Sequence, residues 1–332
     1  MLHKLRLRFQ SNLTNTSYPI FADTLFGHIC WAIHDLEGEP ALTQFLAAYD
    51  DNTPPLLLSD GFPADTWPRP KLKPLPRSLV RDLLHSLDLD LDSREGVMRF
   101  QQLQKIDSLT RLEWEQLVAP GQEGFNAEQI LRLLANRDPR PRRELPRNVD
   151  ISHNVIDRLT GLPLLGERGH FYSQEYVCTA QTASFDLYVQ LTPDLMSQER
   201  LSLLLKYIGR IGYGKDKSTG KGAFTVNLPD QWETLTPPTQ GNRVLTLSVG
   251  IPCANLTQGY YTLVPKYGRL GGHWATHGQP HKKPLLMHTA GSTYTPLSDL
   301  KPYYGSLLKD VHPNLTPVRH YAYLLVWPFV EV

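Results

Sequence analysis

The sequence lacks features that mark membrane and secreted proteins. No apolar run approaches the ~20 residues that a membrane-spanning helix needs, and the first residues lack the apolar centre of a signal peptide. The cysteines are few and far apart, without paired spacing: Cys30, Cys178 and Cys253. This usage predicts reduced thiols rather than a disulfide framework. We therefore expect a cytoplasmic protein with no membrane partner.

An excess of either charge is also missing. Lys and Arg number 34 against 33 for Asp and Glu, a net charge of +1, so the whole chain exerts no overall attraction on nucleic acid. Any nucleic-acid site must come from a local cluster of cations. At 332 residues with 41% hydrophobic content, the chain can form two cores. The 27 prolines, many within 54–76 and 139–146, indicate long connections.

A glycine-rich segment at 209–224 is the most informative stretch. Its glycines are Gly209, Gly212, Gly214, Gly220 and Gly222, and between them stand Lys215, Lys217, Ser218, Thr219 and Lys221. Glycines permit positive φ and close approach to a ligand, and lysines and hydroxyls suit phosphate oxygens. Apolar spacing at 201–208 predicts a helix before the segment, and alternation at 224–228 predicts a strand after it.

Parts of this loop also match two other kinds of segment, a P-loop and a surface turn. Gly209 to Lys215 has the glycine and lysine spacing of a P-loop, but a P-loop follows a strand, precedes a helix and has Ser or Thr after the Lys. Here the flanks are reversed and Asp216 follows Lys215, so we exclude nucleotide-triphosphate binding of that kind. A solvated surface turn remains the alternative.

The order of expected elements predicts a βαββαβ unit. A strand at 3–9 has a buried side and a basic side (Lys4, Arg6, Arg8) that we expect to be solvated. Asp23 is expected to be the N-cap of a helix that ends at Gly38. Strands at 56–58 and 185–191, a helix and the strand at 223–228 complete the unit.

A large insertion, about 61–180, interrupts this unit. Helices are expected at 95–118 and 127–136. Five arginines follow in an irregular segment, which favours phosphate contact: Arg137, Arg140, Arg142, Arg143 and Arg147. Residues 151–161 and 172–177 then predict a hairpin, for which an ordinary turn without a ligand is the alternative.

A linker at 234–242 separates domain 1–235 from a β-rich domain at 243–332.

Three motifs resemble one protein family. Gly212-x-Gly214, five residues and Gly220-x-Gly222 resemble the glycine-rich loop of the RAMP superfamily of CRISPR proteins, although many members have an apolar residue where this chain has Lys221. The segment 22–31 resembles the Asp-Thr-Leu-Phe-Gly helix start of the fourth Csm subunit of type III-A effector complexes. Segment 151–161 resembles the Asn-x-x-x-Arg-x-Thr thumb of that family, with His153, Arg158 and Thr160 at matching positions.

This resemblance implies a fold and a function. It implies an α+β chain of two ferredoxin-like (RRM-like) domains, the first with a large helical and thumb insertion. The family's role, shared with the Cas-five-like group, is a non-catalytic subunit that caps the 5′ tag of the guide RNA (crRNA), kinks it with the thumb, and docks the large palm-domain subunit beside the backbone RAMP subunits. Type III-B counterparts share this architecture, so the subtype stays open.

The expected RNA contacts combine the loop, the arginines, the thumb and the first helix. They are Gly212, Gly214, Lys215, Lys217, Ser218, Thr219, Gly220, Lys221, Gly222, Arg143, Arg147, His153, Arg158, Thr160, Asp23 and His28.

Two other classes of function remain as alternatives. A metal-independent RAMP endoribonuclease that processes CRISPR repeats would use His28 or His34 as general base. A β module for a small molecule or a protein would leave the arginines and loop lysines unexplained. His273, His277 and His281 have spacing that suggests zinc, but Gly278 and Pro280 prevent a single helical face, so we expect no metal and no cofactor.

Overall fold

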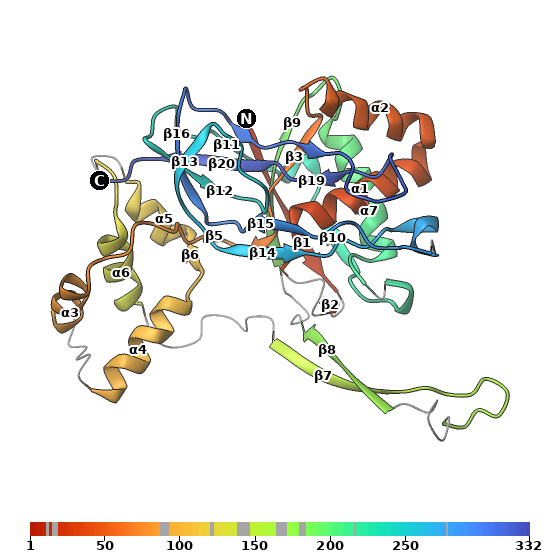
Figure 1. Ribbon diagram of the computed structural model, residues 1–332, viewed down its shortest axis with the longest axis horizontal. Coiled ribbons are helices and arrows are strands. Elements are labelled where there is room, and N and C mark those ends of the chain that lie inside the picture. The colour runs from red at the N-terminus through yellow and green to blue at the C-terminus, as the bar shows by residue number, and fades with distance from the viewer. Residues whose placement is uncertain are drawn as a thin grey trace.

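The computed structural model describes most of the chain (Figure 1). The described residues are 1–10, 13–14, 19–86, 93–119, 123–137, 147–163, 171–178, 184–215, 217–276 and 278–332. None of the helices that they form combines the length and apolar character that crossing a membrane requires.

The first sheet is antiparallel and has the strand order β10-β1-β9-β3. Its strands are β1 (Leu2–Phe9), β3 (Leu56–Leu58), β9 (Ser184–Leu191) and β10 (Phe224–Val226). Helices α1 (Ala22–Glu37) and α7 (Gln198–Ile211) pack beside each other against it, with α2 (Glu39–Asp50) next to α1 (Figure 1). In chain order this is β1-α1-β3-β9-α7-β10, so the predicted βαββαβ order is confirmed. Shorter strands β4 (Phe62–Pro63) and β11 (Glu233–Leu235) extend the sheet.

The start of α1 differs from the prediction. The helix begins one residue before Asp23, and the N-cap residue is Phe21, which offers no side-chain acceptor. Asp60, which follows β3, accepts the backbone N–H of Ala22 at 2.8 Å instead. The prediction that Asp23 is the N-cap was therefore wrong, because an acceptor distant in sequence satisfies the helix terminus. Gly38 ends the helix with φ 90°, as predicted.

A second sheet, order β13-β16-β12-β20-β17, is formed by the C-terminal third. Its strands are β12 (Arg243–Thr246), β13 (Leu256–Tyr260), β16 (Thr293–Pro296), β17 (Tyr303–Tyr304) and β20 (Leu324–Phe329), accompanied by the hairpins β14 (Leu263–Lys266)/β15 (Leu285–His288) and β18 (Leu307–Leu308)/β19 (His320–Tyr321). The described residues of 243–332 contain no α-helix, only the 3₁₀ turns of η4 (Gly272–Thr276). The α+β class is thus confirmed, whereas a second ferredoxin-like domain is not.

The end of β3 joins the two sheets. Leu58 N donates to the hydroxyl of Tyr321 at 2.8 Å, and Asp60 N donates to the carbonyl of Leu247 at 2.8 Å. The buried apolar side chains of both sheets, including Leu5 of β1 and Leu325 of β20, belong to one continuous core. The two units are therefore packed through shared core residues.

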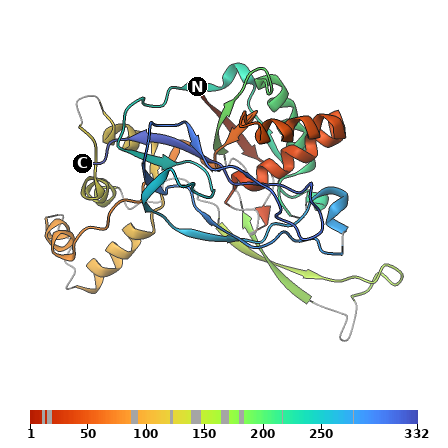
Figure 2. The ribbon, with the colours of Figure 1, turned by 45° about the horizontal axis from the view of Figure 1, so that its top comes forward.

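The insertion forms two bodies on different sides of the sheets (Figures 1 and 2). The first is helical, with β5 (Thr66–Pro68), α3 (Arg77–His85), α4 (Arg94–Lys105), β6 (Ser108–Thr110), α5 (Arg111–Leu117) and α6 (Ala127–Ala135). The helix expected at 95–118 is divided because β6 pairs with β5, and a capping box between Thr110 and Glu113 starts a new helix.

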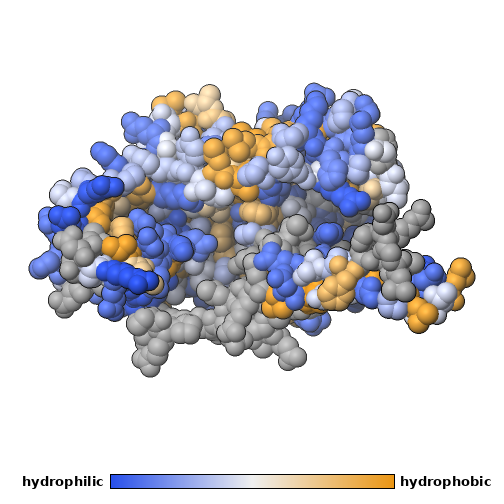
Figure 3. All heavy atoms as spheres, turned by 60° about the horizontal axis from the view of Figure 1, so that its bottom comes forward, coloured by the Kyte–Doolittle hydropathy of each residue, from blue (hydrophilic) through white to orange (hydrophobic). Residues whose placement is uncertain are grey.

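The second body is a long hairpin of β7 (Arg147–Asn154) and β8 (Phe171–Cys178), which extends away from the sheets. The short strand β2 (Leu13–Thr14) pairs with β8 at its base. Figure 3 shows apolar and polar residues mixed along the hairpin, at lower right. A protruding hairpin was predicted here and is present.

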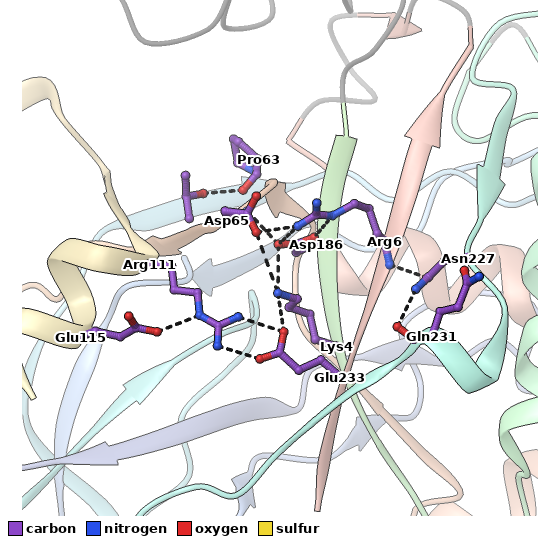
Figure 4. A network of polar contacts seen from close by, with 11 residues as sticks. Lys4, Arg6, Pro63, Asp65, Arg111, Glu115, Asp186, Asn227, Gln231 and Glu233 are labelled. Atoms are coloured by element: carbon purple, nitrogen blue, oxygen red, sulfur yellow. Dashed lines mark hydrogen bonds and ion pairs between the residues drawn. The ribbon is translucent and has the colours of Figure 1, made fainter.

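Ion pairs engage Lys4 and Arg6 on the basic side of β1 (Figure 4). Arg6 Nε lies 2.7 Å from the fully buried carboxylate of Asp186, and Lys4 Nζ lies 2.8 Å from Glu233. Glu233 also accepts Arg111 of α5 at 2.7 Å, which links the helical insertion to the sheet. The Lys4 side chain is only 12% exposed, so the expectation of a solvated basic side was wrong for this residue. Lys4, Arg6 and Arg111 are therefore engaged in ion pairs, and those at Glu233 attach the helical insertion to the sheet.

Candidate nucleic-acid interface

The glycine loop closes on itself by backbone contact. It leaves α7 at Gly212 with φ 101°, passes through the 3₁₀ turn η2 (Lys217–Thr219), and returns so that Tyr213 N donates to Gly222 O at 2.8 Å. A Cβ atom on Gly222 would lie 2.0 Å from Tyr213 O, and one on Gly212 would lie 2.3 Å from Lys221 O. The two chain segments thus lie in close contact where the loop begins and ends, which we call the neck of the loop. Any side chain on Gly212 or Gly222 would clash there, so both positions require glycine. Gly220, with φ 78°, has no atom within 4 Å of its Cβ position.

His28 of α1 contacts the glycine loop at Tyr213 and Gly214. Its Nε2 accepts the backbone N–H of Gly214 at 3.0 Å, and its ring centroid lies 5.1 Å from that of Tyr213. Burial, with a smaller contribution from the Lys217 cation, lowers the pKa of His28 to about 4. The imidazole is thus neutral at physiological pH, and its unprotonated nitrogen is already engaged by the loop.

The loop lysines differ in their surroundings. Lys215 is exposed, Lys217 is half-buried near His28, and Lys221 extends toward the hairpin. The Nζ atom of Lys221 lies 4.8 Å from the centroid of the Tyr176 ring in β8, which is a cation–π contact. Thr219 and Gly220 are exposed at the top of the loop. The structure therefore joins the glycine loop to the base of the hairpin.

Aromatic side chains continue from this contact along the hairpin. Tyr176 Oη and His153 Nε2 lie 3.1 Å apart, and the His153 ring is stacked on Tyr172 with centroids 5.2 Å apart and planes at 18°. Tyr176 is buried at the base, whereas Tyr172 is 46% exposed. Lys221, Tyr176, His153 and Tyr172 thus form one row from the loop outward.

The tip of the hairpin is a turn held by Asp157. Its Oδ1 accepts the N–H of Leu159 at 2.7 Å and that of Thr160 at 3.4 Å, and Gly161 closes the turn with φ 68°. Arg158 and Thr160 are exposed here, and Leu159 is 96% exposed. These two predicted contact residues therefore lie at the far end of the hairpin from the glycine loop.

Comparison with known proteins gives the fold. No family model and no curated protein matches the sequence. A crystal structure of a Csm1-Csm4 cassette in complex with cA4 contains a chain with TM-score 0.56 and 14% identity, covering 99% of this chain and 98% of that chain. A Csm3-Csm4 subcomplex of the type III-A CRISPR-Cas interference complex gives TM-score 0.54 and 13% identity over 98% of this chain and 99% of that chain.

The chain has the fold of a Csm4-like RAMP subunit. A second Csm1-Csm4 cassette, in complex with AMPPNP, agrees with TM-score 0.52 and 17% identity over 98% of both chains. The family resemblance inferred from the loop, helix and thumb motifs is confirmed at the level of the fold, over almost the full length of the chain.

Within this Csm4-like fold, Asp23 is placed differently from the loop residues. Its carboxylate lies 3.0 Å from Lys266 Nζ and 3.5 Å from His320 Nε2, and the side chain is only 7% exposed. Asp23 therefore connects α1 to the hairpins β14/β15 and β18/β19 in this structure. Its predicted RNA contact stays a prediction.

Several predicted residues fall outside the described part of the chain. Arg143 lies there, as do the side chains of Arg147 and Ser218, although the Arg147 backbone begins β7. His277 of the histidine trio is also outside, and the described residues contain no group of three His, Cys, Asp or Glu placed to hold a metal ion.

The row of aromatic side chains was only half recognised from the sequence. The sequence pattern identifies His153 as a thumb residue, whereas Tyr172 and Tyr176 lie in the segment 172–177, for which it predicts only one side of a hairpin. The available signal was alternation: Tyr172 and Tyr176 stand four residues apart in a strand, which places both on one face. Their proximity to His153 depends on the register of the hairpin.

Proposed function

We propose that this chain is a non-catalytic RNA-binding subunit of a type III CRISPR interference complex. In this proposal it caps the 5′ tag of the guide RNA and docks the large palm-domain subunit and the backbone RAMP subunits. The fold supports this role, since chains of Csm1-Csm4 and Csm3-Csm4 assemblies share it.

The observation that carries the RNA-binding part is the contact between Lys221 and Tyr176. It makes the lysine-bearing loop and the aromatic hairpin one continuous surface. Single-stranded RNA is bound by this combination, in which cations follow the backbone and aromatic rings stack on the bases. Because the net charge is only +1, the chain as a whole exerts little attraction on polyanions. RNA binding must therefore depend on this local cluster of cations.

We expect the loop lysines to dominate the salt dependence of RNA binding. Three neutralised phosphates on a single strand give a log–log salt slope of about −2, or about twentyfold weaker binding between 50 and 200 mM salt. Replacing Lys215, Lys217 and Lys221 together by Ala should therefore flatten the slope. The measurement is a titration of a fluorescent guide RNA carrying the repeat-derived tag, repeated over a salt series.

The control variant replaces three exposed lysines outside the loop and the hairpin, Lys73, Lys105 and Lys301. It makes the same change in net charge, so it separates a local contact from a general electrostatic effect. The control should keep the slope of the unmodified protein. A loop variant with an unchanged slope would contradict the assignment of these lysines to phosphate.

We also expect the chain to leave RNA intact. The candidate general bases of the endoribonuclease alternative are His28 and His34. The Nε2 of His28 is engaged by Gly214 N, and the ring nitrogens of His34 lie 3.1 Å from Asp35 and 3.5 Å from Glu39. The test incubates the protein with a labelled CRISPR repeat in EDTA, beside a metal-independent ribonuclease as positive control. Cleavage that His28→Ala abolishes would establish the endoribonuclease alternative.

A further inference from the structure

The hairpin has two chemically different faces. Directly opposed residues of paired strands project to the same side, and successive residues alternate between sides. The pairs His153–Tyr172, Ile151–Gln174 and Val149–Tyr176 therefore share one side, which we call the aromatic face. The opposite side, the acidic face, contains the pairs Asp150–Glu175, Ser152–Ser173 and Asn154–Phe171.

Charge distinguishes these faces as surfaces for RNA. On the acidic face two carboxylates stand directly opposite each other, Asp150 and Glu175, and would repel a phosphate backbone. The described side chains of the aromatic face include no carboxylate, and the cation Lys221 lies over its base. A polyanion that leaves the glycine loop is therefore attracted to the aromatic face and repelled from the other.

The geometry of Tyr172 is suited to stacking. Its ring is nearly parallel to His153, with planes at 18°, and the side chain is 46% exposed. His153 is in turn fixed by its contact with the Tyr176 hydroxyl at 3.1 Å. Tyr176 itself is 2% exposed and cannot receive a base, so it acts as a positioning residue for the pair above it.

We propose that Tyr172, held flat against His153, is a stacking platform for one unpaired base of the bound single-stranded RNA. The strand runs from the glycine loop past Lys221 and along the aromatic face. This inference rests on the proposed function and adds to it the residue that receives a base and the face of the hairpin that the RNA follows. Stacking on an aromatic side chain is tolerant of sequence, so the platform selects for an unpaired nucleotide rather than for a particular base.

Base-analogue fluorescence tests the platform directly. The full chain is titrated with single-stranded tag RNAs that carry 2-aminopurine at successive positions, since stacking quenches this fluorophore. We expect quenching at one position with the unmodified protein and with Tyr172→Phe, which keeps the ring. Tyr172→Leu keeps an apolar side chain without a π face, and should lose the quenching and bind about tenfold more weakly.

An abasic nucleotide at the quenched position provides a control that is independent of the stability of the variant. It should weaken binding to the unmodified protein by about the same factor as Tyr172→Leu, and should cause no further loss in that variant. Losses that multiply would mean that the ring and the base do not interact, and would overturn the platform.

The remaining outcomes separate this inference from the function on which it rests. RNA binding with the lysine-dependent salt slope, but without a quenched position and with full affinity in Tyr172→Leu, overturns the platform alone. Loss of a protein subunit from Tyr172→Leu complexes with unchanged RNA affinity also overturns it, because the face then docks protein. No RNA binding by the unmodified chain overturns both.

Discussion

Replacing Gly222 by alanine should destabilise the protein by about 3 kcal/mol or more, whereas replacing Gly220 should cost only about 1 kcal/mol. Both glycines have a left-handed backbone, with φ 72° and 78°, so both substitutions carry the same conformational penalty. Only at Gly222 would the new Cβ also overlap backbone atoms, 2.0 Å from Tyr213 O and 2.7 Å from Tyr213 N. These atoms cannot move without breaking the hydrogen bond that closes the neck of the loop.

The two variants therefore form a matched pair that differs in packing alone. Denaturant unfolding of both, followed by circular dichroism, gives the free energies of unfolding to compare. Gly222→Ala should also weaken RNA binding, because opening the neck moves Lys221 away from Tyr176. Equal stabilities for the two variants would show that the loop relaxes freely and that its neck is not a rigid support.

The parts of the fold that were predictable are those determined by local sequence. The helix before the glycine loop and the strand after it follow from apolar spacing at 201–208 and 224–228, and both are present as α7 and β10. Gly38 at the end of α1 is another local signal, since a residue with φ 90° there favours glycine. Once the strands and helices were placed, their order in the chain sufficed to predict the βαββαβ unit.

Predictions failed where a distant residue decides the outcome. The N-terminus of α1 is capped by Asp60, which only the folded chain brings beside Ala22. The alternation of β1 predicts that Lys4 is an exposed cation, but in the sheet Lys4 forms ion pairs with Asp186 and Glu233. Neither partner could be identified from spacing, because tertiary contacts override local preference.

Of the candidate site, the glycine loop was predictable from the sequence and the row of aromatic side chains was not. The loop residues were found because glycine and lysine are informative by themselves. The aromatic row was not found as a unit, because it needs the register that pairs His153 with Tyr172 and the approach of Lys221 to Tyr176. A one-residue slip in that register would move the aromatic side chains to opposite faces.

Asp60 makes the junction of the two sheets sensitive to pH. Its Oδ1 accepts Ala22 N at 2.8 Å and Val249 N at 3.1 Å, so one carboxylate connects the start of α1 to the segment that follows β12. Burial raises the pKa of Asp60 to about 7, although the two N–H donors favour the ionised form. The folded state thus keeps a proton that the unfolded state has released between pH 3.8 and about 7.

Stability from this group is therefore greatest below pH 3.8 and falls as the pH rises toward 7, by about 4 kcal/mol in total. His28 and His320 act in the opposite direction, because burial lowers the pKa of each to about 4 and the unfolded chain binds their protons first. The pH profile of the unmodified protein combines these opposing effects, so the contribution of Asp60 must be read from a difference between variants.

Asp60→Asn should remove the titration and keep an oxygen that both N–H groups can reach. Its free energy of unfolding relative to the unmodified protein should rise by about 3 kcal/mol between pH 4 and pH 7, because the titration is not complete at either end of this range. Asp60→Ala should lose about 2–4 kcal/mol even at pH 4, because two buried donors lose their acceptor. Denaturant titrations of the three proteins across this range make the measurement. Parallel profiles for Asp60→Asn and the unmodified protein would mean that the Asp60 carboxyl titrates normally and that the junction does not respond to pH.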